Sequence, residues 1–147
     1  MIMGKQQRIG VYINMLNCKL IKILSANFRR AGINLTCEQF IVMDTLWRQG
    51  KMTQSAIAAM MHKDKNSITQ FIDSLERKKL VRRLERPSDR RINDIEVTEQ
   101  GEALREKTIK VATGTMHIVL KGFSGNELDA FENMLALIDA NIDKADL

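Results

Sequence analysis

A chain of 147 residues is long enough for one domain with its own hydrophobic core, or for such a domain with a helical arm. Hydrophobic residues make up 44% of it but aromatic residues only 5%, which favours a mainly helical fold over a β-sandwich or barrel. No uncharged apolar stretch approaches the ~20 residues that a membrane span requires, and no signal peptide is recognisable. We therefore expect a cytoplasmic protein without a membrane partner.

The net charge of +5 is unevenly distributed along the chain. Residues 99–147 are acidic overall, whereas the preceding parts are basic, and residues 63–91 contain ten basic but only five acidic side chains. A basic segment next to an acidic one is the pattern expected of a protein that binds a polyanion such as nucleic acid. From the charge alone, an ordinary solvated surface explains this basic segment equally well.

The N-terminal part of the chain predicts one long helix. Apolar residues recur every three or four positions from Ile9 to Phe28, which predicts an amphipathic helix over residues 8–30. Gly32 follows it as a stop.

Two shorter helices are expected next. Thr36 and Gln39 stand three apart in a capping-box pattern, which predicts a second helix that runs to about residue 48 and is closed by Gly50. A third helix, short and rich in Ala, begins at residue 52 or 53 and ends near residue 61.

The fourth predicted helix, residues 64–78, has two different faces. Asp64 is a good N-cap, because its carboxylate can accept hydrogen bonds from the first free amides. The apolar positions follow the i, i+3, i+4, i+7 pattern of a buried face: Ile68, Phe71, Ile72 and Leu75. The opposite face is polar: Asn66, Thr69, Gln70, Asp73 and Arg77.

A basic hairpin follows this helix. Residues 81–86 and 92–97 predict two short strands, and the five residues 87–91 between them predict a loop, because Pro87 presets φ for a turn. Arginines in this loop are placed to reach away from the protein body.

Two more helices complete the prediction. Thr98 caps a fifth, which is expected to run without a break to about residue 121. Ser124 and Glu127 form another capping box and open a sixth. The apolar positions of this last helix repeat every three or four residues, as at a helix–helix seam: Leu128, Phe131, Leu135, Ile138 and Ile142.

The order of the predicted elements is a helix, a tight turn, a polar-faced helix and a basic hairpin. This order predicts a winged helix-turn-helix that binds double-stranded DNA. The first turns of a helix in the major groove meet base edges, and Asn66 and Gln70 can pair with adenine through two hydrogen bonds. Ser67 and Thr69 can bond to bases or contact a thymine methyl group. A further set is predicted to touch phosphate: Thr53, Ser55, Lys63 and Lys65. Arg90 and Arg91 are predicted to enter the minor groove.

Four segments of the sequence resemble the MarR (multiple antibiotic resistance regulator) family. They are Leu35-Thr36-Cys37-Glu38-Gln39-Phe40, Thr53-Gln54-Ser55-Ala56-Ile57-Ala58, Ile72-Asp73-Ser74-Leu75-Glu76-Arg77-Lys78-Lys79-Leu80-Val81, and Asp89-Arg90-Arg91 with Val97-Thr98-Glu99-Gln100-Gly101. The Asp-x-Arg motif of the hairpin is the most specific. The resemblance covers nearly the whole chain.

This resemblance implies a homodimeric regulator, usually a repressor, that binds a pseudo-palindromic operator and is released by a small aromatic molecule or by cysteine oxidation. It implies dimerisation helices in residues 1–34 and 99–147, and a DNA-binding domain in residues 35–98. Arg91 resembles the family's minor-groove arginine, and Asp89 the residue that braces the wing.

The same comparison identifies two departures from the family pattern. His62 in the turn before the fourth helix, and Lys79 just after that helix, stand where the family often has glycine.

Several residues suggest additional roles that the pattern leaves open. Cys37 lies in the first turn of a helix, where the helix dipole lowers a thiol pKa, so a redox sensor is one alternative, whereas Cys18 is expected to face the core or a dimer seam. An adaptable ligand pocket is a second alternative, with these lining residues: Tyr12, Met15, Met43, Trp47 and Met116.

No cofactor, metal or enzymatic activity is expected. The two histidines, His62 and His117, are more typical of structural positions than of a zinc site, and no catalytic motif is recognisable. A protein-interaction adaptor that keeps the winged-helix scaffold without DNA binding is the competing class. The basic stretch from residue 63 to residue 91 argues against it.

Overall fold

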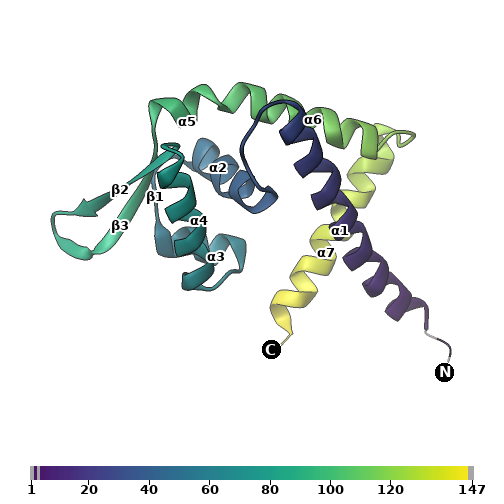
Figure 1. Ribbon diagram of the computed structural model, residues 1–147. Coiled ribbons are helices and arrows are strands. Elements are labelled where there is room, and N and C mark those ends of the chain that lie inside the picture. The colour runs from purple at the N-terminus through teal and green to yellow at the C-terminus, as the bar shows by residue number, and fades with distance from the viewer. Residues whose placement is uncertain (1, 3, 146–147) are drawn as a thin grey trace. The chain divides into compact units, whose positions relative to one another are not determined.

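The computed structural model describes residue 2 and residues 4–145, and it is mainly helical with one small sheet (Figure 1). The helices are α1 (Lys5–Arg30), α2 (Cys37–Gln49), α3 (Gln54–Met61), α4 (Lys65–Arg77), α5 (Glu99–Ala103), α6 (Arg105–Val119) and α7 (Gly125–Lys144). The strands are β1 (Met52–Thr53), β2 (Val81–Arg86) and β3 (Asp89–Val97). The chain divides into two compact units, one that ends at Thr115 and one that begins at Met116.

The predicted fold class, a winged helix with a small β-wing, is confirmed, and the helix starts predicted from capping boxes are accurate. The side chain of Thr36 accepts a hydrogen bond from the Gln39 amide at 3.1 Å, and the Gln39 side chain returns one to the Thr36 amide, as in a capping box. Ser124 and Glu127 form the same box at the start of α7. Since these caps satisfy otherwise free amides, short polar residues in the sequence locate the helix starts.

The sheet contains a strand that the periodicity did not reveal. Its order is β1-β3-β2, with antiparallel neighbours throughout. Strand β1 has only two residues, which pair with Asp94 and Ile95 of β3, so the predicted start of the third helix at residue 52 or 53 is instead this strand followed by the Thr53 cap. Two residues are too few to display the alternation by which a strand is recognised.

The predicted loop of residues 87–91 is too long. Strand β3 begins at Asp89, so that only Pro87 and Ser88 form the turn, and the register shifts between Glu85 and Arg86. Charged residues rarely mark a strand, yet Asp89, Arg90 and Arg91 belong to β3, which pairs with β2. A bulge of this kind bends and twists a ribbon near its end.

The predicted fifth helix is wrong in one respect, because it is broken at Leu104 into α5 and α6. Its start is as predicted: the Thr98 hydroxyl accepts from the Gly101 amide at 3.0 Å and donates to the Lys79 carbonyl at 2.6 Å. The first turn of α5 is thereby held against the chain that enters β2. The continuous apolar period of this segment gave no sign of the break.

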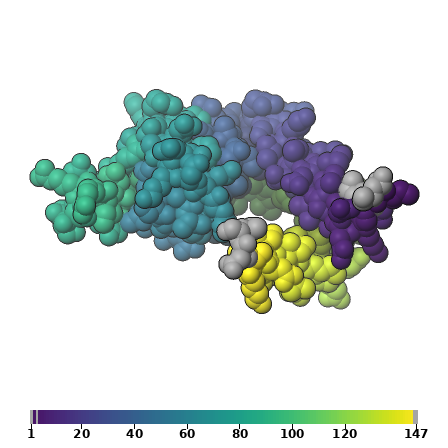
Figure 2. Space-filling model, turned by 90° about the horizontal axis from the view of Figure 1, so that it is seen from below, coloured from purple at the N-terminus to yellow at the C-terminus, as the bar shows by residue number. Residues whose placement is uncertain are grey.

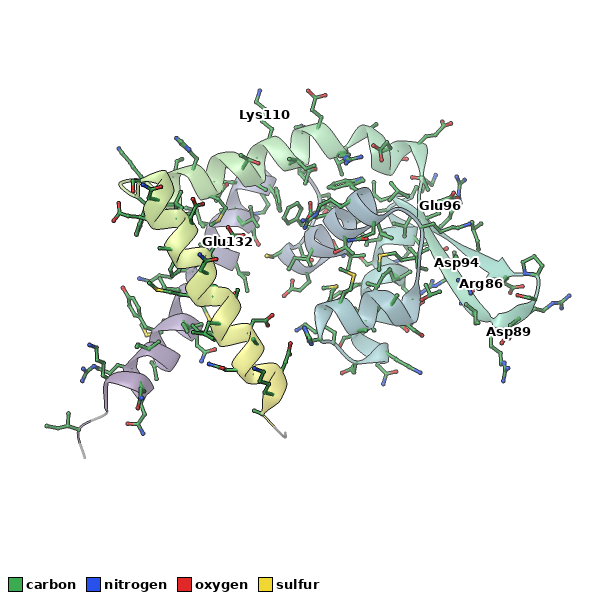
Figure 3. All side chains as sticks on the ribbon, turned by 180° about the vertical axis from the view of Figure 1, so that it is seen from behind. Arg86, Asp89, Asp94, Glu96, Lys110 and Glu132 are labelled. Atoms are coloured by element: carbon green, nitrogen blue, oxygen red, sulfur yellow. The ribbon has the colours of Figure 1, made fainter. Side chains whose placement is uncertain are left out.

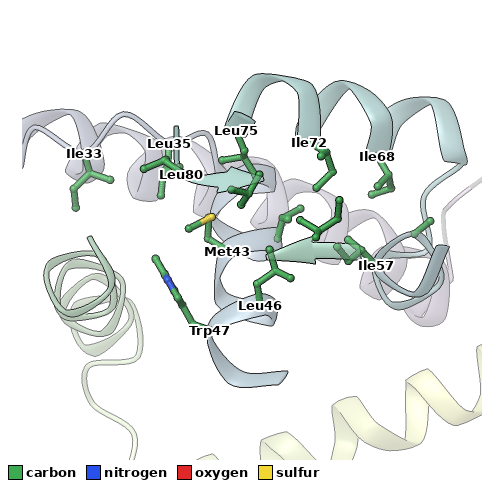
Figure 4. Close-up of a cluster of buried hydrophobic side chains, with 14 of the residues drawn as sticks. Ile33, Leu35, Met43, Leu46, Trp47, Ile57, Ile68, Ile72, Leu75 and Leu80 are labelled. Carbon is green, nitrogen blue, oxygen red and sulfur yellow. The ribbon is translucent and has the colours of Figure 1, made fainter. Parts of the chain in front are cut away.

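The core of the first unit lies between α2, α3, α4 and the sheet (Figure 4). Phe28 of α1 also belongs to this core cluster. The predicted apolar face of α4 is buried, with Ile68, Ile72 and Leu75 fully enclosed and Phe71 partly so. Complete burial of each such side chain contributes about 1.5–3 kcal/mol to folding. This burial orients α4 so that its polar side faces away from the core.

Three helices of the first unit end in the same kind of turn, in which the last residue has positive φ. Gly32 (φ 72°), His62 (φ 51°) and Lys79 (φ 63°) occupy this position after α1, α3 and α4. In each case the next amide donates to a carbonyl five residues earlier, as in a Schellman motif. His62 and Lys79 are the two residues that stand where the family often has glycine. They are also the two non-glycine residues of the described chain whose backbone is in the left-handed region.

Replacing Lys79 by Gly is expected to raise the free energy of unfolding by about 1 kcal/mol, because glycine avoids the steric cost of a left-handed backbone. His62→Gly should gain less, since His tolerates this conformation better than most residues. Urea denaturation followed by circular dichroism measures both. The reverse change, Gly32→Ala, should lower stability by a similar amount, and an increase there would contradict the argument.

Two long helices have exposed apolar side chains. On α1 the exposed apolar positions are Ile9, Val11, Tyr12, Ile13, Met15, Leu16 and Ile23. On α7 they are Phe131, Met134, Leu135, Leu137, Ile138 and Ile142. Helix α7 buries none of its residues within this chain. Exposed apolar faces of this length are typical of interaction surfaces.

Helix α1 is also long and apolar enough to pass a length-and-composition test for a membrane span. One helix of this kind near the N-terminus is weak evidence, because core helices of soluble proteins pass the same test. Lys19 and Lys22 lie within the stretch.

Candidate nucleic-acid interface

Helix α4 presents a polar N-terminal face to solvent. The Asp64 carboxylate accepts a hydrogen bond from the Ser67 amide at 2.7 Å, and this bond lowers the Asp64 pKa. Asn66 and Gln70 are exposed on the side opposite the buried Ile68 and Ile72. Their amide groups are therefore accessible for hydrogen bonds to an adenine edge, as the sequence predicted. The residue assignments themselves stay predictions.

Thr69 lies on the same helix, but its hydroxyl is already bonded within the protein. It donates to the Lys65 carbonyl at 2.8 Å and accepts from the Gln54 side-chain amide at 2.7 Å. The structure thus connects Thr69 to α3, and its methyl group is the part that stays available for contact with a thymine. Spacing along the sequence could not reveal the Gln54 bond, because it joins residues of two helices.

A pocket next to this face brings together predicted contact residues from three segments. Its lining residues are Thr53, Gln54, Ser55, Lys65, Thr69, Arg91, Ile92 and Asn93. Of these, Gln54, Ile92 and Asn93 were not identified from the sequence. The pocket joins the start of α3, the start of α4 and the wing, so these elements form one continuous surface.

The predicted phosphate-contacting and basic residues differ in exposure, and three of them, Thr53, Ser55 and Lys65, line this pocket. Ser55, Lys63, Lys65 and Arg77 are exposed, whereas Thr53 is partly buried and its hydroxyl accepts from the Ala56 amide at 3.1 Å. That bond caps α3. A phosphate at Thr53 would therefore meet a hydroxyl already fixed in orientation.

The wing is the hairpin of β2 and β3, which projects from the α3–α4 body (Figure 2). Near its tip the Asp89 carboxylate accepts from both the amide and the guanidinium of Arg91, with Nε–Oδ1 3.1 Å and Nη2–Oδ2 3.2 Å. These bonds lower the Asp89 pKa. The Arg91 side chain nevertheless stays 91% exposed, so Asp89 orients it without withdrawing it from solvent. Arg90 is also exposed.

A second carboxylate–guanidinium pair lies in the wing and was missed by the sequence analysis. Arg86 contacts Asp94 through two parallel bonds, Nε–Oδ2 3.0 Å and Nη2–Oδ1 3.1 Å, and the two side chains point toward one another (Figure 3). Asp94 is nearly buried, and the Arg86 guanidinium keeps its pKa below the usual range. This pair ties the bulged end of β2 to the strand that pairs with β1.

The two cysteines lie in different environments, and only the expectation for Cys37 is contradicted. Burial, together with the charge of Glu38, raises the pKa of the Cys37 thiol, so the expected lowering by the helix dipole is wrong. A raised pKa reduces the thiolate fraction on which oxidation depends. Cys18 is exposed within this chain.

The five residues predicted to line a ligand pocket are distributed over different environments. Met43 and Trp47 lie in the core, where the Trp47 indole nitrogen has no hydrogen-bond partner, whereas Tyr12 and Met15 are exposed on α1. Met116 belongs to the unit that begins at that residue. A pocket between them stays a prediction. Among the described residues, no group of three or more His, Cys, Asp or Glu side chains is arranged to hold a metal ion.

These features define a winged helix-turn-helix protein: a short helix α3, a polar-faced helix α4 and a basic hairpin on one surface. Residues 35–92 match the model of the MarR family. Together with the relatives and the fold described next, this match supports a MarR family transcriptional regulator.

The chain is similar to regulators and structures of this family. It is 27% identical over 101 residues to the HTH-type transcriptional regulator YsmB of Bacillus subtilis, with 69% of each chain covered. It shares its fold with a mutant MarR from E. coli crystallised with operator DNA (TM-score 0.81, 23% identity, 89% and 93% covered). It also shares it with BpsR from Bordetella bronchiseptica (TM-score 0.82, 21% identity, 99% and 100% covered). These proteins are regulators, not enzymes.

Proposed function

We propose that this chain acts as a homodimer that binds a pseudo-palindromic operator in double-stranded DNA and represses transcription in the cytoplasm. The observation that carries the proposal is the single surface formed by the exposed polar start of α4 and the exposed Arg91 of the wing. A helix in the major groove and an arginine in the adjacent minor groove read one face of a duplex together. The mutant MarR structure, of the same fold, contains operator DNA.

We propose that DNA binding and dimerisation belong to separate parts of the chain, with the domain boundaries predicted from the sequence. Residues 35–98 bind DNA, and residues 1–34 and 99–147 hold the two copies together. The exposed apolar faces of α1 and α7 support this assignment, because a second copy would cover both. A dimer of this type binds half-sites about one helical turn apart.

Release by a small aromatic molecule is the proposed regulation. DNA binding by the similarly folded BpsR is regulated by 6-hydroxynicotinic acid. The unpartnered Trp47 nitrogen and the adaptable Met43 beside it in the core support a ligand near this part of the chain. The raised Cys37 pKa disfavours control by oxidation instead.

The test is a fluorescence anisotropy titration of the purified protein against labelled duplexes that tile the DNA upstream of its gene. We expect one duplex to bind roughly a thousandfold or more tighter than a scrambled duplex of the same composition at physiological salt. Raising the salt should weaken both. Equal affinity for all duplexes would contradict sequence-specific regulation, and absence of DNA binding would favour a protein-interaction adaptor.

Replacing Arg91 by Ala is expected to weaken binding to the preferred duplex by about ten- to a hundredfold, because a guanidinium in a narrow minor groove contributes about 1–3 kcal/mol. Circular dichroism and sedimentation should be unchanged, since the side chain is exposed. Lys144→Ala, which removes one positive charge from the end of α7, is the control. Unchanged affinity of the Arg91 variant would show that the wing tip does not contact DNA.

A further inference from the structure

Arg83 belongs to strand β2 of the wing, yet its guanidinium contacts helix α4. Its Nη2 lies 2.6 Å from the Asp73 carboxylate, and its Nη1 lies 3.0 Å from that of Glu76. The Arg83 amide also donates to Glu76, at 3.1 Å. The side chain is only 21% exposed, so these contacts are partly shielded from water. The main chain and the side chain of Arg83 are therefore both bonded to helix α4.

The same guanidinium reaches a third element. Its Nε lies 3.5 Å from the side-chain oxygen of Gln54 on α3, and Nη2 lies 3.5 Å from the Thr69 carbonyl on α4. Gln54 in turn donates to the Thr69 hydroxyl. Arg83 is thus in contact with both helices of the helix-turn-helix from a position in the wing.

An arginine is suited to this place for a geometric reason. The planar guanidinium has five N–H donors in a fixed fork, so that it can contact two carboxylates and an amide oxygen at once. Asp73 and Glu76 are three residues apart and share one face of α4. Without the guanidinium, these like charges would repel each other and would add negative charge beside the proposed DNA surface.

We propose that Arg83 is a positioning residue that sets the wing relative to α4, so that Arg91 and the polar face of α4 engage the same duplex. A two-stranded ribbon is marginally stable alone and takes its orientation from what holds its base. The inference rests on the proposed DNA binding. It adds a residue that contacts no DNA but determines how two DNA-contacting elements are combined.

The neighbouring Arg82 provides a matched control. It lies on the same strand and carries the same charge, but its Nε pairs with Glu96 of β3 at 2.8 Å, so that its ion pair stays within the wing. R82Q and R83Q each remove one positive charge from β2. Only R83Q removes contacts between the wing and α4.

The first measurement is a double-mutant cycle on the preferred upstream duplex. We expect R83Q to weaken binding about tenfold more than R82Q, and Arg91→Ala to have a smaller effect in the R83Q protein than in the wild type. The smaller effect follows because a wing released from α4 no longer places Arg91 at the groove. Equal losses for R82Q and R83Q, or an unchanged effect of Arg91→Ala, would overturn the inference.

The second measurement needs no DNA. Amide hydrogen exchange, followed by mass spectrometry, should become faster in peptides from both β2 and α4 in R83Q, but only in wing peptides in R82Q. Exchange of α4 that is equal in the two variants would overturn the positioning role. If the wild-type protein discriminates no upstream duplex, the proposed function fails, and the exchange data alone decide whether Arg83 joins the wing to α4.

Discussion

Gly101→Ala is expected to lower the free energy of unfolding by about 3 kcal/mol, a large effect for the addition of one methyl group. A Cβ atom at Gly101 would lie 2.2 Å from the Leu80 carbonyl oxygen and 2.7 Å from a Val97 methyl group. The first of these neighbours is backbone, which cannot rotate away. The first turn of α5 would have to move off the segment before β2, which would strain the Thr98 bonds to the carbonyls of Lys79 and Leu80.

The control for this substitution is Gly114→Ala in α6, where a Cβ atom would meet nothing within 4 Å. That change should raise stability by about 1 kcal/mol, because alanine favours a helix interior over glycine. Urea denaturation of both variants gives the two values. A Gly101 variant as stable as the wild type would show that α5 and β2 are not held as closely as described.

Leu135→Asp is expected to convert the proposed dimer to a monomer and to weaken binding to the preferred duplex by roughly a hundred- to ten-thousandfold. Leu135 lies in the exposed apolar stripe of α7, so the substitution costs the single chain little. In a dimer the carboxylate would be buried without a partner, which is costly. A monomer then binds one half-site without the gain from simultaneous attachment of the second.

Asn133→Asp is the matched control, since it adds the same charge on the opposite side of α7. Analytical ultracentrifugation should show a dimer for this variant and the wild type but a monomer for Leu135→Asp, with equal helical content by circular dichroism. A dimeric Leu135→Asp protein would show that this stripe is not the interface. A monomer that keeps full affinity would show that DNA binding does not require two copies.

Much of the candidate interface could be predicted because its signals are local. Asp64 caps α4 through an amide three residues away, and the burial of Ile68, Ile72 and Leu75 requires that Asn66 and Gln70 face outward. The arrangement of the other contacts was not accessible in this way. The Gln54–Thr69 bond, the Arg86–Asp94 pair and the Arg83 contacts join residues from different elements.

The amino-acid sequence by itself determined the capped helix starts, the buried face of α4, the position of the wing and the family resemblance, because hydrogen bonds and burial within a few residues decide them. The tertiary structure alone decided the break at Leu104, the two-residue strand β1, the raised pKa of Cys37 and the need for glycine at position 101. The last three of these depend on atoms brought close by packing of distant segments. The close approach of α5 to the Leu80 carbonyl is the clearest case, since a glycine without positive φ gives no local sign of its role.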